Sequence, residues 1–91
     1  MRLDKYLQLS RIIRQRSLGK ELCQYDRVFQ GDTDDHPLKA SHEVNVGDIL
    51  TVIAYNRRLV VKILEVPATK NVSKQKAKDL YEVIKEESLE G

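Results

Sequence analysis

Tryptophan is absent from this sequence of 91 residues, and cysteine occurs once, at Cys23. A single cysteine cannot form an internal disulfide, and an unpaired thiol is typical of proteins kept in a reducing compartment. No run of consecutive apolar residues is longer than four, which argues against a membrane span and a secretory signal peptide. We therefore expect a cytoplasmic protein that does not enter a membrane.

The sequence also lacks the residue groupings that catalysis or metal binding requires. The two histidines, His36 and His42, and the one cysteine do not match the ligand spacing of a known metal site. Ser17 has no partner set that would activate it as a nucleophile, and the four glycines are too scattered for a phosphate-binding loop. His36 and its neighbouring aspartates could hold a cation weakly, but a solvated turn is favoured. We expect no enzyme activity, no cofactor and no metal.

Length and composition favour one small domain. A chain of this length buries roughly two-thirds of its unfolded-state surface, which supports one modest core and leaves little room for an enclosed cleft. Charged residues make up 33% of the sequence, so a large part of the surface is expected to be charged and solvated. We expect this domain to be a monomer.

Charge is distributed unevenly along the chain, although its net value is only +2. Residues 1–20 carry six basic groups and one acidic group, whereas residues 21–50 carry two basic and seven acidic groups. Residues 51–91 carry eight basic and six acidic groups. A polyanion is therefore expected to be drawn to the first third and repelled by the second.

Two short helices are expected at the N-terminus. Apolar residues recur at spacings of three and four, which predicts an amphipathic helix over residues 2–10. Ser17 predicts the N-cap of a second helix. The inner face of that second helix would carry Leu18, Leu22 and Cys23.

A small sheet is expected in the middle of the chain. Val28 and Phe29 begin a short strand, and residues 30–37 form a polar turn. Two segments rich in β-branched residues, 49–55 and 59–66, predict a β-hairpin with its turn between them.

One further helix is expected near the C-terminus. Pro67 ends the preceding strand, Ser73 can cap the helix, and Ala77 with Ile84 contributes to an apolar stripe. The order of two helices, a sheet and a last helix predicts an α+β fold.

Three arginines, Arg11, Arg14 and Arg16, lie within six residues, in the stretch that joins the two N-terminal helices. The planar guanidinium group can bind two phosphate oxygens at once and stack on bases. Arg2, Lys5 and Lys20 are expected to project from the polar sides of the helices. From charge alone a merely solubilising surface is equally favoured, and charge does not separate RNA from DNA or from an acidic protein.

A second basic stretch lies near the C-terminus. Lys74, Lys76 and Lys78 alternate around the expected helix, which favours a solvated surface. Arg57 and Arg58, near the tip of the expected hairpin, could touch a phosphate.

Several short motifs, taken together in order, resemble the αL RNA-binding motif, the domain named after ribosomal small-subunit protein S-four. The resemblance covers about residues 1–60 and implies two helices packed on a small sheet, with the helical face and its connecting loop holding RNA. We expect this S-four-type domain over residues 1–66, and a helical extension with an acidic tail over residues 67–91. The motifs are MRLDKYL, SRIIRQRS, Lys20, RVFQG, LKAS and the turn at residues 46–49.

The opening MRLDKYL and the closing IKEESLEG resemble the branch of stand-alone factors of bacterial ribosome-associated quality control. This branch is related to the ribosome-associated heat-shock protein that carries the same domain. The resemblance implies binding to stalled large ribosomal subunits, through the P-site tRNA and large-subunit rRNA. It also implies that the peptidyl-tRNA is stabilised while alanine tails are added, with the alanine-tailing factor of the pathway as a partner.

The resemblance also assigns roles to individual residues. It implies that Asp4 orients neighbouring basic side chains. Asp26 stands where the family usually has glycine, and we expect it to tolerate a left-handed backbone. The loop at residues 32–37 is longer and more acidic than usual, so it is expected to face away from RNA or to contact a basic partner. The implied RNA-contacting residues are Arg2, Lys5, Arg11, Arg16 and Lys20.

Three other interpretations remain open. The same surface could serve a heat-shock-type factor that recycles large subunits. A protein-interaction module could use the basic residues to bind an acidic partner. The chain could also be a detached accessory domain of an RNA-modifying enzyme.

Overall fold

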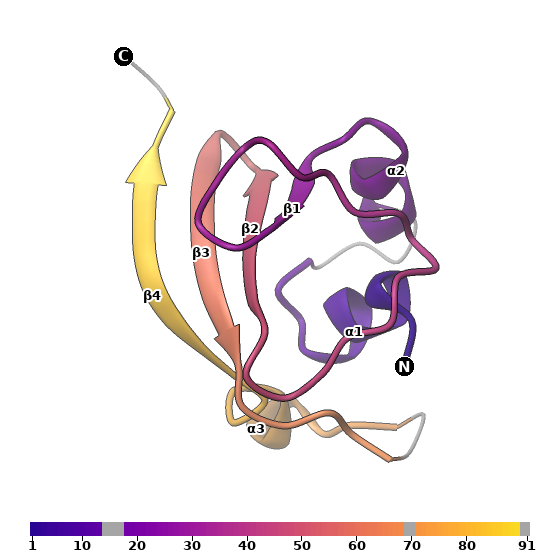
Figure 1. Ribbon diagram of the computed structural model, residues 1–91. Helices are drawn as coiled ribbons and strands as arrows, with labels where there is room; N and C mark the ends of the chain where they lie inside the picture. The colour runs from indigo at the N-terminus through magenta and orange to yellow at the C-terminus, as the bar shows by residue number, and fades with distance from the viewer. Residues whose placement is uncertain (14–17, 69–70, 90–91) are drawn as a thin grey trace.

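A four-stranded antiparallel sheet, with two helices against it, forms the framework of the protein (Figure 1). The computed structural model describes residues 1–13, 18–68 and 71–89. The strands lie side by side in the order β1-β2-β3-β4, and the predicted α+β class is confirmed. The elements in chain order are α1 (Leu3–Leu9), α2 (Leu18–Gln24), β1 (Val28–Gln30), β2 (Ile49–Ala54), β3 (Arg57–Ile63), α3 (Lys74–Ala77) and β4 (Tyr81–Ser88).

The core lies between α1 and the sheet. Leu3, Tyr6 and Leu7 are completely buried on one side of α1, as the helical period of the sequence predicts. They belong to one cluster with Leu50 and Val61, which the sheet contributes. Burying a large apolar side chain contributes about 1.5–3 kcal/mol, so this cluster fixes α1 on the sheet.

The β2–β3 hairpin is confirmed, but its turn lies one residue earlier than predicted. Tyr55 and Asn56 both have left-handed backbones, with φ of 54° and 59°, and Ala54 pairs with Arg57. Positive φ at both central residues is the geometry of a type I′ turn, which matches the twist of paired strands. The second strand therefore begins at Arg57.

The predicted C-terminal helix is confirmed at its Ser73 cap but is wrong beyond Ala77. The helix α3 has only four residues, although the Oγ of Ser73 does accept a hydrogen bond from the backbone N–H of Lys76 as its cap. The chain then enters the eight-residue strand β4, which pairs with β3 along its length and has Val61 opposite Val83. Ile84, expected in the apolar stripe of the helix, is 52% exposed.

The reason lies in pairing with a distant strand. Residues 82–86 include two β-branched side chains, which favour a strand, and β3 offers a free edge that satisfies their backbone N–H and C=O groups. The helical extension expected over residues 67–91 is thus incorrect for residues 81–88. The domain boundary at residue 66 stays a prediction.

Candidate nucleic-acid interface

Arg2 lies at the start of α1, where an ion pair with Asp4 holds its guanidinium group. The Arg2 Nε atom is 3.2 Å from Asp4 Oδ1, and its second terminal nitrogen is 3.3 Å from Asp4 Oδ2. The Arg2 side chain is 60% exposed, and that of Asp4 is 22% exposed. A guanidinium group has five N–H donors, so the pair leaves donors of Arg2 facing solvent.

Asp4 itself is fixed by the backbone of the helix. Its Oδ1 atom also accepts a 2.8 Å hydrogen bond from the backbone N–H of Lys5. A carboxylate in the first turn is favoured by the positive end of the helix dipole. Asp4 therefore links the helix end to the Arg2 side chain, and its orienting role in RNA binding stays a prediction.

Arg11 follows the other end of α1 and has a left-handed backbone, with φ of 60°. This conformation reverses the chain directly after the buried Ser10, so that Ile12 and Ile13 return to the core. A left-handed conformation costs about 1–2 kcal/mol in a residue with a Cβ atom, and burial of the two isoleucines offsets this cost. The Arg11 side chain remains exposed.

The predicted contact residues do not all fall within the described structure. Arg14 and Arg16 lie outside the described residues, and so does the side chain of Lys20, although its backbone is part of α2. Arg2 and Arg11 flank the opposite ends of α1, which at seven residues is about 10 Å long. The predicted contact residues that the structure describes therefore lie along one helix rather than meeting at one point.

A groove of about 850 Å³ lies between the end of α1 and α3, and Arg11 is on its border. Lys74 and Lys78 also line it, and both were assigned from the sequence to a solvated surface. Their spacing of four residues could have revealed a shared helix face. That they line the same groove as Arg11 depends on the tertiary fold, and no pattern in the sequence indicates it.

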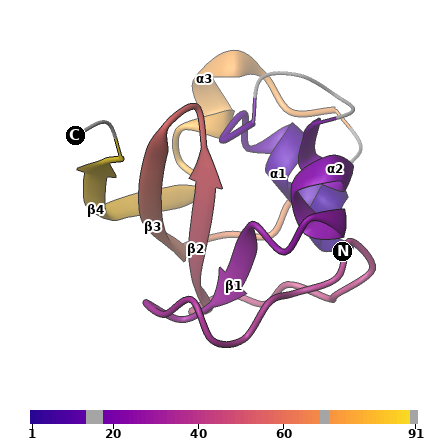
Figure 2. The ribbon, with the colours of Figure 1, turned by 90° about the horizontal axis from the view of Figure 1, so that it is seen from above.

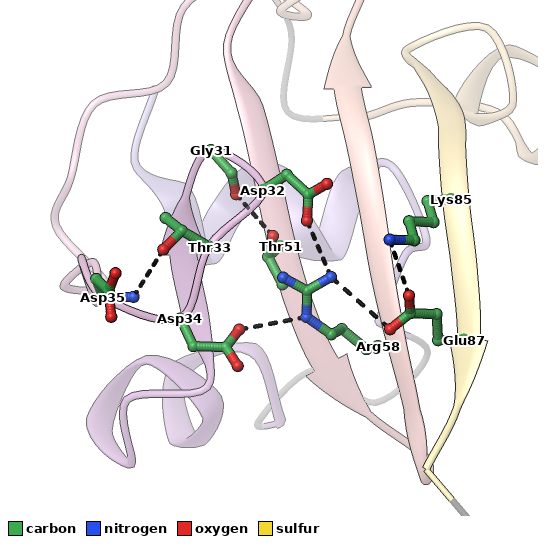
Figure 3. Close-up of polar contacts among 9 residues, drawn as sticks. All are labelled: Gly31, Asp32, Thr33, Asp34, Asp35, Thr51, Arg58, Lys85 and Glu87. Atoms are coloured by element: carbon green, nitrogen blue, oxygen red, sulfur yellow. Dashed lines mark hydrogen bonds and ion pairs between the residues drawn. The ribbon is translucent and has the colours of Figure 1, made fainter.

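The acidic loop is tied to the sheet through Arg58 (Figure 3). Arg58 contacts Asp32 at 2.9 Å, Asp34 at 3.2 Å and Glu87 at 3.9 Å, and its side chain is only 14% exposed. The hydrogen bond to Asp32, followed by that to Asp34, raises the pKa of Arg58 above its ordinary value despite the opposing effect of burial. Arg58 therefore stabilises the loop, and the phosphate contact considered for it from the sequence is not supported.

Cys23 is buried in the core. Burial, followed by the nearby charge of Asp4, raises the pKa of its thiol to about 11. The thiolate is the nucleophilic form of cysteine, so Cys23 is a protonated core residue at neutral pH.

Two further findings concern the described residues only. Within residues 1–13, 18–68 and 71–89, no three histidine, cysteine or acidic side chains gather where they could hold a metal ion. In the same part of the chain, no helix is both long enough and apolar enough to cross a membrane.

Solved structures share this fold. Heat shock protein 15 from Vibrio cholerae, described as trimeric, superimposes with a TM-score of 0.77 at 23% identity, covering 91% of this chain and 80% of that one. The solution structure of the hypothetical protein HP1423 gives a TM-score of 0.75 at 28% identity, covering 93% and 98% of the two chains. The fold and the basic border of α1 place the chain in the class of S-four-type proteins.

Curated relatives identify the branch within this class. The RQC P-site tRNA stabilizing factor of Halalkalibacterium halodurans is 43% identical, covering 98% of this chain and 96% of the relative. The proteins of the same name from Bacillus subtilis and Streptococcus pneumoniae are 37% and 36% identical, and each alignment covers at least 97% of both chains. The chain belongs to the family of RQC P-site tRNA stabilizing factors. No protein-family model matches it.

Proposed function

We propose that this protein acts in ribosome-associated quality control by binding RNA on stalled large ribosomal subunits and stabilising the P-site tRNA. The family relationship, which extends over nearly the whole chain, supports a role at the P-site tRNA. One structural observation supports the proposal that the protein binds RNA. Arg2 is held by Asp4 at the start of α1 while its guanidinium group remains exposed.

The Arg2–Asp4 pair prepares the guanidinium group for a phosphate. An exposed arginine loses rotamer freedom when it binds a ligand, at a cost of up to about 2 kcal/mol. Two hydrogen bonds to Asp4 restrict the side chain beforehand, which reduces that cost. The remaining donors can then bind phosphate oxygens of a folded RNA.

The other basic residues extend this contact in our proposal. Lys5 follows Asp4 on α1, and Arg11 borders the opposite end of the same helix. Phosphates of rRNA and tRNA bound along α1 would release counterions, which makes the affinity sensitive to salt. The further proposed RNA-contacting residues are Arg14, Arg16 and Lys20.

The protein itself performs no chemical step in this proposal. It holds the peptidyl-tRNA in the P site while the alanine-tailing factor of the pathway extends the nascent chain. Binding energy from several phosphate contacts, rather than a catalytic group, would keep the tRNA in place.

The test is co-sedimentation of the purified protein with large subunits that carry peptidyl-tRNA. Arg2→Ala is expected to weaken binding about tenfold or more, because hydrogen bonds to charged groups contribute about 1.5–3 kcal/mol. Arg57→Ala is the matched control, since Arg57 is also exposed and paired with a carboxylate, that of Glu86 at 2.6 Å, but lies on β3 rather than at α1. Equal binding by wild type and Arg2→Ala, or a flat dependence of affinity on salt, would contradict the proposal.

A heat-shock-type recycling factor is the second candidate. The similarity to heat shock protein 15 supports it only at the level of the fold. A stalled-chain assay in a deletion strain separates the two, because loss of the protein should abolish alanine tails only if it acts during tailing. A protein-interaction module would instead retain its partners after RNase treatment of an extract.

A further inference from the structure

A groove between α1 and α3 collects basic side chains from two distant parts of the sequence. We call it the α1–α3 groove and define it by Arg11, Asn71, Lys74, Lys78 and Tyr81. In Figure 2, α3 lies at the top of the view, next to the segment that follows α1. With a volume of about 850 Å³, the groove is large enough for part of a nucleic-acid backbone.

Lys74 and Lys78 share one face of α3 and its C-cap. Lys78 still has a helical backbone, with φ of −66° and ψ of −23°, so the two lysines are related by one helical turn. Residues four apart lie above one another, separated by a rise of about 6 Å. Lys76 contacts Glu65 at 2.9 Å instead. All three lysines are exposed, as the sequence predicts, but only Lys76 forms an ion pair within the described residues.

The three cations of the groove are not neutralised within the described structure. Arg11, Lys74 and Lys78 are exposed, and none is within ion-pair distance of a carboxylate in residues 1–13, 18–68 or 71–89. No acidic residue of that part of the chain lines the groove. Basic walls around a concave surface concentrate the positive potential there and attract a polyanion.

A buried hydrogen bond fixes the two sides of the groove relative to each other. The hydroxyl group of Tyr6, on α1, donates to the carbonyl oxygen of Leu80, three residues after the end of α3, at 2.7 Å. Ile13 and Ala77, which line the groove, are also buried. The cations are thus presented by a packed part of the fold rather than by independent segments.

We propose that the α1–α3 groove binds a phosphate backbone of RNA, through Lys74 and Lys78 together with Arg11. This inference rests on the proposed function and extends its contact surface from α1 to α3. Continuity through Arg11 favours RNA over an acidic protein, because one polynucleotide could follow both surfaces. The backbone could belong to rRNA or to tRNA, which share this chemistry.

The test compares two double variants with equal loss of charge. Lys74→Gln/Lys78→Gln removes the groove lysines. The control Lys76→Gln/Lys85→Gln removes two lysines that already contact Glu65 and Glu87, each at 2.9 Å. Both variants are first compared with the wild type by thermal unfolding, so that a loss of binding can be separated from a loss of folding.

Binding is measured with purified large subunits, with and without P-site tRNA, at several salt concentrations. The groove variant is expected to bind at least about tenfold more weakly. The slope of log affinity against log salt should fall by about 1.4–1.8, since each phosphate contact contributes about 0.7–0.9. A loss in both arms assigns the phosphates to rRNA, and a loss only with tRNA present assigns them to tRNA; either supports the groove.

The groove proposal would be overturned if the groove variant kept the wild-type affinity and the wild-type salt slope in both arms. An equal loss of binding in the control variant would also overturn it. Arg2→Ala is measured alongside. If it weakens binding while the groove variant does not, the proposed function stands without the groove. If neither variant weakens binding, the proposed function fails as well.

Discussion

Tyr6 and Leu80, separated by 74 residues in the sequence, are joined by a buried hydrogen bond from the phenolic hydroxyl to the backbone carbonyl. The same carbonyl oxygen accepts from the backbone N–H groups of Leu64 and Glu65, at 2.9 and 3.1 Å. One acceptor therefore connects α1, the chain after β3 and the entry to β4. The first helix and the last strand are thereby linked at one buried point.

Replacing Tyr6 with phenylalanine tests this link. Tyr6→Phe is expected to lower the free energy of unfolding by only about 0.5–1.5 kcal/mol, because the Leu80 carbonyl keeps its two backbone donors. Urea unfolding measures the difference, and Tyr25→Phe is the control, since Tyr25 is 69% exposed. A loss above about 3 kcal/mol would show that more than this hydrogen bond had been disturbed.

Alkaline pH is expected to destabilise the protein. The Cys23 thiol has its pKa raised by burial to about 11, from an ordinary value of 9.0, and burial also raises the pKa of Tyr6. The unfolded state loses these protons first, so stability is fully present below about pH 9 and declines as the pH rises through 11. Urea unfolding at several pH values should show a shallower decline for Cys23→Ala than for the wild type, and equal declines would contradict this role of Cys23.

Asp4 provides a test in which charge and orientation predict opposite results. Asp4→Ala removes a negative charge from the proposed RNA surface, so charge alone predicts tighter binding to large subunits. Because Asp4 holds Arg2 and caps the Lys5 N–H group, we expect binding to weaken by about fivefold or more. Co-sedimentation at fixed salt decides between them, with thermal unfolding as the folding control. Tighter binding would exclude an orienting role.

Arg58 is expected to control the acidic loop rather than RNA binding. In Arg58→Met, the carboxylates of Asp32, Asp34 and Glu87 would lose their shared cation and repel one another. Amide hydrogen exchange should become faster over residues 31–36, with a loss of about 1 kcal/mol of stability because the carboxylates are half-exposed. Arg57→Met is the control and should leave exchange in the loop unchanged. Unchanged exchange in Arg58→Met would contradict the prediction, because it would show that other contacts hold the loop.

The left-handed backbone of Asp26, with φ of 55°, predicts an order of stability among substitutions there. Glycine has no Cβ atom to strain, so Asp26→Gly should raise stability by about 0.5 kcal/mol once its greater unfolded-state entropy is included. Asp26→Ala should lower stability by about 0.5–1 kcal/mol, since aspartate tolerates this conformation better than alanine. Thermal unfolding should detect both changes as shifts of a few degrees, and the reverse order would contradict the argument.

The N-terminal half of the fold was predictable because local patterns determine it. The helical period of Leu3, Tyr6 and Leu7 coincides with their burial on α1, and the short strand predicted at Val28 and Phe29 is confirmed as β1. The C-terminal strand was not predictable in this way. Ala77, Leu80 and Ile84 also have helical spacing, which competes with the strand preference of the β-branched residues, and pairing with β3, which no local pattern contains, decides for the strand.

The candidate site was predictable to a smaller extent. The basic character of residues near α1 follows from the sequence, but the Arg2–Asp4 geometry needs the fixed start of the helix. Lys74 and Lys78 were assigned to a solvated surface because the lysines of this stretch alternate around the expected helix. They line the same groove as Arg11 because the fold brings α3 near the end of α1, which sequence spacing does not specify.

The pairing of β4 with β3 also determines where a label can be attached. Ser88 lies opposite Arg57, and the N–H of Leu89 donates to the carbonyl of Asn56. The strand β4 therefore ends beside the hairpin turn, at the opposite end of the sheet from α3 (Figure 1). Met1, in contrast, accepts a backbone hydrogen bond from Val44 next to α1. A fluorophore or affinity tag placed after residue 89 should therefore leave the α1–α3 groove accessible, whereas one fused before Met1 would crowd the first helix.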